Sequence, residues 1–99
     1  MQTTQLRRYT IRPDAHQDFV NFWRQNVTTL RRDAGFTIEF AVMDEQASEF
    51  IWAVSAPGDK KAFQKLEATY NASPTRTAVF ANIPGWVTAV QISFIQPAY

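Results

Sequence analysis

The sequence predicts an α+β fold in which one four-stranded antiparallel sheet carries two helices on one of its faces. Three observations support this prediction. The predicted elements follow the order β-α-β-β-α-β, and one apolar stripe at helical spacing runs from Ala15 to Ala34. Within "SEFIWAVSAPGD" (Ser48–Asp59), side chains alternate between two uncharged sets, which are Phe50, Trp52 and Val54 on one face and Ile51, Ala53 and Ser55 on the other. Right-handed crossovers then give the strand order 4-1-3-2.

The first strand, "QLRRYTI" (Gln5–Ile11), is stopped by Pro13, and Asp14 is expected to cap the first helix. The apolar stripe of this helix comprises Ala15, Phe19, Phe22, Trp23, Val27, Leu30 and Ala34. The residues expected off the stripe are Gln17, Asp18, Asn21, Arg24, Gln25, Arg31 and Arg32. Gly35 follows as the residue that ends the helix.

The second strand is "FTIEFAVMD" (Phe36–Asp44), and a polar turn joins it to the third strand as a hairpin. Asp59 is expected to cap a second helix. One side of that helix carries Ala62, Phe63, Leu66 and Tyr70. Ser73 and Pro74 predict the start of a short extra helix, and the last strand is Trp86–Ile95.

Composition excludes several classes of function. Ten Lys and Arg residues against nine Asp and Glu give a net charge of +1, which provides no basic excess for binding phosphate backbones. The absence of Cys excludes disulfides, thiolate catalysis and Cys-based zinc sites, and the single His leaves little room for another metal site. No stretch has the length of a membrane span, so we expect a cytoplasmic single domain over residues 1–99 with no metal and no cofactor.

The face of the sheet without helices is expected to present several aromatic and aliphatic side chains. RNA-recognition domains share this order of elements and stack bases on strand aromatics, and Tyr9, Phe50 and Trp52 occupy comparable positions. Their motif, however, requires Gly where this chain has Glu49, and a small residue where it has Ile51. A lipid surface is disfavoured as the partner of this face, because the sequence contains no amphipathic helix with a basic face. The expected partner is therefore a second copy, with two sheets closing into a barrel, and neither nucleic acid nor membrane.

Four segments in order resemble NIPSNAP-domain proteins of the dimeric α+β barrel superfamily. They are "LRRYTIRPD" (Leu6–Asp14), "FVNFWRQNVTTLRRDAGF" (Phe19–Phe36), "EFIWAVS" (Glu49–Ser55) and "ATYNASP" (Ala68–Pro74). The resemblance covers nearly the whole chain. It implies a ferredoxin-like protomer and a homodimer, and it supplies no established reaction.

The family pattern can be carried over position by position. The Arg-x-Tyr of the first strand falls on Arg7 and Tyr9, and the aromatic-Trp pair of the first helix falls on Phe22 and Trp23. The Tyr and Ser-Pro that follow the second helix fall on Tyr70, Ser73 and Pro74. Asp14 departs from the pattern, because many relatives have Gly after the Pro.

Six residues are candidates for ligand binding: Arg7, Tyr9, Glu39, Trp52, Tyr70 and Arg76. Charges inside strands either reach solvent at the rim or line a cavity, where Arg and carboxylate would pair and bind an anionic or carbonyl-bearing ligand. Arg7 and Tyr9 share one face, and Arg8 lies on the other. Tyr70 and Arg76 flank the "NASP" break and would form either a pocket mouth or, for Tyr70, the end of the apolar stripe.

Two other sets have open interpretations. The aromatic residues Trp23, Trp52, Trp86 and Phe94 form either an apolar ligand box or core and interface. His16 is interpreted as a surface residue. Superfamily enzymes that bind haem commonly use a His on a helix near the pocket, and the second helix has none, which disfavours haem.

The leading functional hypothesis is a homodimeric NIPSNAP-like protein that binds a small apolar or aromatic molecule between sheet and helices. The alternative is a cofactor-independent monooxygenase or isomerase acting on an aromatic or polyketide-like substrate, in which polar groups stabilise a carbanion. A third possibility is a purely structural dimerisation module. No catalytic triad, Gly-rich phosphate loop or supported carboxylate pair occurs in the sequence.

Overall fold

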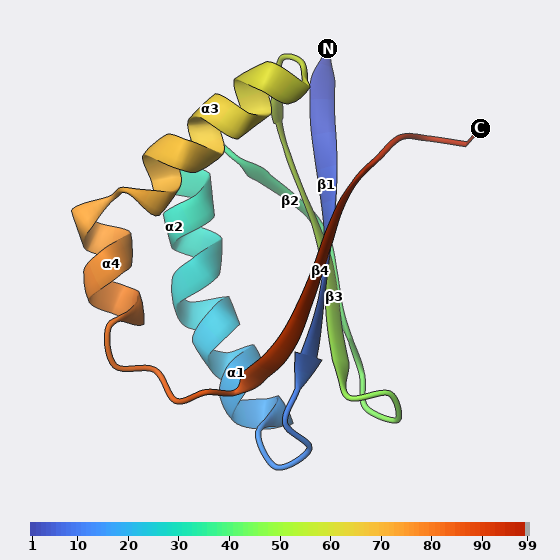
Figure 1. Ribbon diagram of the computed structural model, residues 1–99, viewed down its shortest axis with the longest axis vertical. Coiled ribbons are helices and arrows are strands. Elements are labelled where there is room, and N and C mark those ends of the chain that lie inside the picture. Colours follow the sequence, from blue (N-terminus) through green and yellow to red (C-terminus); the bar gives the residue numbers. More distant parts are fainter. Residues whose placement is uncertain (99) are drawn as a thin grey trace.

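The computed structural model describes residues 1–98 as a two-layer arrangement of sheet and helices (Figure 1). The sheet contains β1 (Gln2–Ile11), β2 (Thr37–Asp44), β3 (Glu49–Pro57) and β4 (Val87–Ile95). Its order is β2-β3-β1-β4 and every neighbouring pair is antiparallel. This is the predicted order 4-1-3-2 read from the opposite edge, so the ferredoxin-like α+β prediction is confirmed.

All helices of the described chain lie on one side of the sheet (Figure 1). The first helical segment comprises α1 (His16–Phe22), the π-helical turn η1 (Trp23–Val27) and α2 (Thr28–Asp33). It is followed after the β2–β3 hairpin by α3 (Lys60–Asn71) and α4 (Pro74–Phe80). Within residues 1–98, none of the helices is long and apolar enough to cross a membrane.

The predicted helix end before Gly35 and the predicted helix starts after Asp59 and Ser73 are confirmed. Gly35 has φ +103°, a conformation that glycine adopts without steric cost, and its N–H donates to the carbonyl oxygen of Arg32 over 3.0 Å. The Asp59 carboxylate accepts from the backbone N–H of Ala62 over 2.9 Å. Ser73 caps α4, which begins at Pro74.

Two predictions at the starts of helices are wrong. Asp14 does not cap the first helix: Ala15 is the capping residue, and the Asp14 carboxylate instead pairs with Arg12 at 3.2 Å. On α3, Phe63 and Tyr70 are buried, but Ala62 is exposed, because the helix turns it away from the sheet. Both errors concern side-chain direction at positions where the helix itself is predicted correctly.

Strand register determines which alternating set faces the helices. Phe50, Trp52 and Val54 are buried beneath the helices, and the pairing of Arg7 with Trp52 brings Arg7 to the same face. The opposite face therefore presents the other alternating set. Its apolar side chains are mostly aliphatic, and Phe40 is the one aromatic residue among the strand residues there. The expectation of several aromatics on that face is wrong, because these large side chains fill the space between sheet and helices.

The π-helical turn brings an unexpected charge inside. Phe19, Trp23, Val27 and Arg31 follow one another in steps of four, and all are buried, with Arg31 only 3% exposed. Steps of four overshoot the 3.6-residue turn of an α-helix and would drift away from the sheet. The additional residue held by the π turn offsets this drift. Arg31, predicted to lie off the stripe, therefore lies on it.

Candidate ligand-binding site

A cavity of about 210 Å³ lies between the sheet and the helices. Its walls come from all the helical elements and from three strands. The lining residues are Arg7, Tyr9, Phe19, Phe22, Trp23, Val27, Arg31, Trp52, Tyr70, Arg76, Phe80, Ile83, Val87 and Val90. Five of the six candidates predicted from the sequence are among them, all except Glu39. Ile83 and Val90 are exposed, so they mark the side on which the cavity meets solvent.

Two of the three lining arginines share one carboxylate. Arg31 donates from both terminal nitrogens to Glu67, over 2.5 and 3.1 Å. Nη1 of Arg7 lies 3.6 Å from the same Glu67 carboxylate, and its guanidinium also donates to Gln5 over 2.6 Å and to the Tyr9 hydroxyl over 2.8 Å. Glu67 is thus the internal counter-charge for this part of the wall.

The third arginine, Arg76, is held by aromatic rings. Its guanidinium carbon lies 4.5 Å from the ring centroid of Phe80 and 5.2 Å from that of Tyr70. The guanidinium carbon of Arg31 lies 4.2 Å from the same Tyr70 ring, so Tyr70 contacts two cations. Among residues 1–98, no carboxylate lies within ion-pair distance of Arg76.

The lining residues also hold every buried side-chain nitrogen or oxygen that lacks a hydrogen-bond partner in the described chain. These atoms are Trp23 Nε1, Arg31 Nε, Trp52 Nε1 and Arg76 Nε. All four are donors, and a buried donor without an acceptor costs about 1–3 kcal/mol. Buried polar groups normally have a hydrogen-bond partner, so these four donors are available to an acceptor in the cavity.

The rest of the wall is apolar and mostly aromatic. The Trp23 and Trp52 rings meet edge to face at 5.4 Å, as do Phe22 and Phe80. Such pairs stabilise the wall beyond the area that they bury. The site therefore combines an apolar box with a cationic, donor-rich side, which is the usual composition of a small-molecule site.

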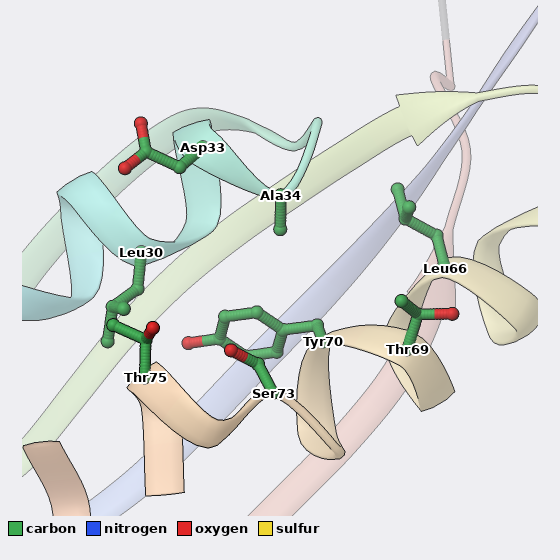
Figure 2. Close-up of a pocket in the computed structure, with 8 residues that line it drawn as sticks. All are labelled: Leu30, Asp33, Ala34, Leu66, Thr69, Tyr70, Ser73 and Thr75. Atoms are coloured by element: carbon green, nitrogen blue, oxygen red, sulfur yellow. The ribbon is translucent and has the colours of Figure 1, made fainter. Parts of the chain in front are cut away.

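A second hollow, of about 290 Å³, lies outside the cavity between α2, α3 and α4 (Figure 2). Figure 2 shows the Tyr70 ring between Leu30 of α2 and Ser73 at the start of α4. Because Tyr70 lines both spaces, it forms the wall between them. None of the unpaired buried donors belongs to a residue lining this outer groove. We therefore assign the candidate site to the inner cavity.

Glu39, the sixth candidate, lies away from the other five. It accepts a hydrogen bond from Ser55 Oγ over 2.6 Å and lines a hollow on the helix-free face with Phe40 and Ile95. The β-bulge between Ile38 and Phe40 shifts the register here. Arg8 also lies on this face and pairs with Glu49 at 3.0 Å.

The predicted aromatic set divides between cavity and core. Trp23 and Trp52 line the cavity, whereas Trp86 packs against Phe22 at a centroid distance of 5.8 Å, and Phe94 packs against Phe63 at 5.4 Å. The His16 ring lies at the start of α1, 3.1 Å from Ser48 Oγ. Residues 1–98 contain no cluster of three or more acidic or His side chains that could hold a metal ion.

Sequence reasoning missed Arg31 and Glu67. Both positions carry a signal in the sequence: Arg31 lies four residues after Val27, and Glu67 lies four residues after Phe63 and three before Tyr70. A cation and an anion at apolar spacing on two different helices indicate a buried pair. The pair can be inferred only when the two helices are known to face each other.

Comparison with known proteins agrees with this fold. The sequence matches no protein-family model and no curated protein. The structure is similar to an uncharacterised NIPSNAP-like domain protein from Burkholderia xenovorans, with TM-score 0.84 and 14% identity, over 97% of this chain and 84% of that chain. It is also similar to a NIPSNAP family protein of unknown function from Agrobacterium tumefaciens, with TM-score 0.86 and 11% identity, over 98% of this chain and 88% of that chain.

A further similar structure is a putative antibiotic biosynthesis monooxygenase from Nitrosomonas europaea, with TM-score 0.72 and 11% identity, over 99% of this chain and 91% of that chain. At these identities the similarity concerns the fold. The predicted resemblance to NIPSNAP-domain proteins is confirmed at that level.

Proposed function

From the NIPSNAP-like fold and the cavity within it, we propose that this protein binds a small apolar or aromatic molecule between its sheet and its helices. The observation that carries the proposal is the cavity of about 210 Å³ lined by aromatic side chains. A protein cavity of about 150 Å³ accommodates benzene. The site therefore suits one substituted ring, and a polycyclic polyketide would require the walls to move apart.

Val90→Trp is expected to abolish binding of a one-ring ligand, because Val90 lines the cavity on its solvent side and is 54% exposed. The matched control is Val42→Trp, since Val42 is 51% exposed on β2 and does not line this cavity. Calorimetric titration with benzyl alcohol and with benzoate measures the effect. Equal affinity of both variants for these ligands would contradict the placement of the binding site in this cavity.

We further propose that two copies pair through the helix-free face of the sheet. The support is chemical: Phe40, Val42 and Ile95 are exposed there, which is unusual for a face that stays in water. The chain after β4 also leaves the sheet on this side (Figure 1), and Gln96 and Pro97 line the hollow beside Phe40. Such a face is self-complementary in a two-fold dimer.

Val42→Asp is expected to convert the dimer to a monomer of about 11 kDa at tens of micromolar, because it places a carboxylate on the pairing face. Val90→Asp is the control: the same substitution on the other edge strand, facing the cavity side. Analytical ultracentrifugation distinguishes them. A monomeric parent chain, or equal dissociation by both variants, would rule out this interface.

A second candidate function is catalytic: oxidation of the bound ring by O₂ without a cofactor. It is supported by the fold similarity to putative antibiotic biosynthesis monooxygenases and by cationic donors that would stabilise an anionic ring. For a monocyclic quinol, two electrons and two protons would pass to O₂, giving the quinone and H₂O₂. Oxygen uptake above the uncatalysed rate would support catalysis. If a quinol binds and oxygen uptake stays at the uncatalysed rate, the catalytic proposal is contradicted and only the binding function stands.

A further inference from the structure

We infer that the molecule bound in the cavity is an anion, a small aromatic carboxylate whose acid group lies against Arg31 and Arg76. This inference rests on the proposed function and adds the charge and chemical class of the ligand. Three independent features support it: the balance of charge around the cavity, the kind of hydrogen-bonding atom left unpaired, and the size of the apolar space.

The charges around the cavity do not balance. Arg7, Arg31 and Arg76 line it, and none of the lining residues is acidic. Glu67 is the single carboxylate within ion-pair distance of these arginines in the part of the chain that the structure describes. Two formal positive charges are left without a counter-charge. Charges removed from water are normally paired, so this wall favours a ligand that brings negative charge.

The unpaired atoms have one polarity. Nε of Arg31 and Nε of Arg76 are buried N–H donors, and the indole N–H groups of Trp23 and Trp52 are buried donors as well. An ionised carboxylate has only acceptors, with about four lone-pair positions. It therefore matches the unpaired donors of this wall, and hydrogen bonds from guanidinium to carboxylate are among the strongest in proteins. An alcohol offers fewer acceptor positions and no negative charge, and a protonated amine would add donors where donors are already in excess.

The remaining space fits one ring. The cavity exceeds the volume of a benzene-binding cavity by about the volume of a few heavy atoms. Phe19, Phe22 and Phe80 line it beside the two indoles and provide faces and edges against which a ring can pack. An acid group on the cationic side and one ring on the aromatic side use the whole site, which defines the benzoate class.

The inference is tested by titrating the full chain at pH 7 with benzoate, benzamide and acetate. Binding is detected from the ¹H–¹⁵N NMR signals of the three indole groups. We expect benzoate to bind at least about tenfold more tightly than benzamide, its neutral counterpart, and than acetate, which lacks the ring. Equal or tighter binding of benzamide would overturn the inference and leave the proposed function intact. Binding of neither ring compound would overturn both.

Arg76→Gln and Glu67→Gln are expected to change benzoate affinity in opposite directions, which distinguishes recognition of the ligand from a general structural role. Arg76→Gln is expected to weaken benzoate binding at least about tenfold and to leave benzamide within about twofold. Arg76 is chosen because its loss leaves no acid unpaired. Arg32→Gln, at an exposed position on α2, is the control and should change neither ligand. Equal weakening of both ligands by Arg76→Gln would overturn the inference.

Glu67→Gln removes the competing carboxylate, so it is expected to strengthen benzoate binding by at least about threefold while leaving benzamide unchanged. It should also make the melting temperature depend more steeply on benzoate concentration, because the ligand then replaces the lost partner of Arg31. Weaker benzoate binding by this variant would show that Glu67 takes part in holding the ligand and would overturn its assignment as a competitor.

Discussion

Trp52→Ala is expected to lower the free energy of unfolding by about 3–5 kcal/mol, because truncating a buried aromatic residue loses its burial and leaves a void. Trp52 is 1% exposed at the centre of β3, and its ring meets those of Tyr9 and Trp23 at 6.2 and 5.4 Å. The guanidinium carbons of Arg7 and Arg31 lie 5.6 and 5.4 Å from its centroid. Truncation therefore weakens both the core and the support of the cationic wall.

Urea denaturation of the parent chain and the variant measures this effect. The control is Trp86→Ala, since Trp86 is only partly buried and packs at the edge of the aromatic cluster against Phe22. We expect the control to lose clearly less stability. A loss below about 1 kcal/mol for Trp52→Ala would show that the site collapses around the missing ring, contrary to a rigid aromatic wall.

Glu67→Ala is expected to lower the free energy of unfolding by about 3 kcal/mol, because it leaves the charge of Arg31 buried without its partner. The Arg31 side chain is 4% exposed and that of Glu67 is 17% exposed, so solvent screens this pair only slightly. Glu49→Ala is the matched control. It breaks the Arg8–Glu49 pair, whose side chains are 39% and 25% exposed, and pairs of this kind contribute about 1 kcal/mol or less.

The double variant Arg31→Met with Glu67→Leu gives the complementary result. It removes both charges and fills the site with apolar side chains, so it should recover most of the stability that Glu67→Ala loses. Denaturation curves at constant ionic strength compare the three variants. Equal losses for Glu67→Ala and Glu49→Ala would show that the Arg31–Glu67 pair behaves as a surface pair.

The elements of this fold could be predicted from local sequence. Period-two alternation marks the strands, and steps of three and four mark the helices. The turn and capping residues Gly35, Asp59 and Ser73 mark where helices end and begin. These signals depend on neighbours a few residues away, so they are present in the chain before it folds. The order of the strands followed from the short connections and the handedness of crossovers.

The membership of the site could be predicted only in part. Tyr70 and Arg76 flank a break between two helices, and Arg7 and Tyr9 are polar groups on one face of a strand, and both patterns are visible in the sequence. Glu39 had the same kind of signal and lies on the opposite face of the sheet, because a β-bulge shifts the register near it. A bulge depends on the pairing of two strands and has no reliable local signature.

The sequence by itself determined the helices and strands apart from the π turn, the sheet order and the high content of aromatic side chains. The tertiary structure decided which face of β3 lies under the helices and which charges enter the cavity. Arg31 is inside because a π turn keeps it in line with Trp23 and Val27, and because Glu67 of α3 lies opposite to pair with it. Side-chain burial depends on packing between distant segments, whereas helix and strand formation depends mainly on near neighbours.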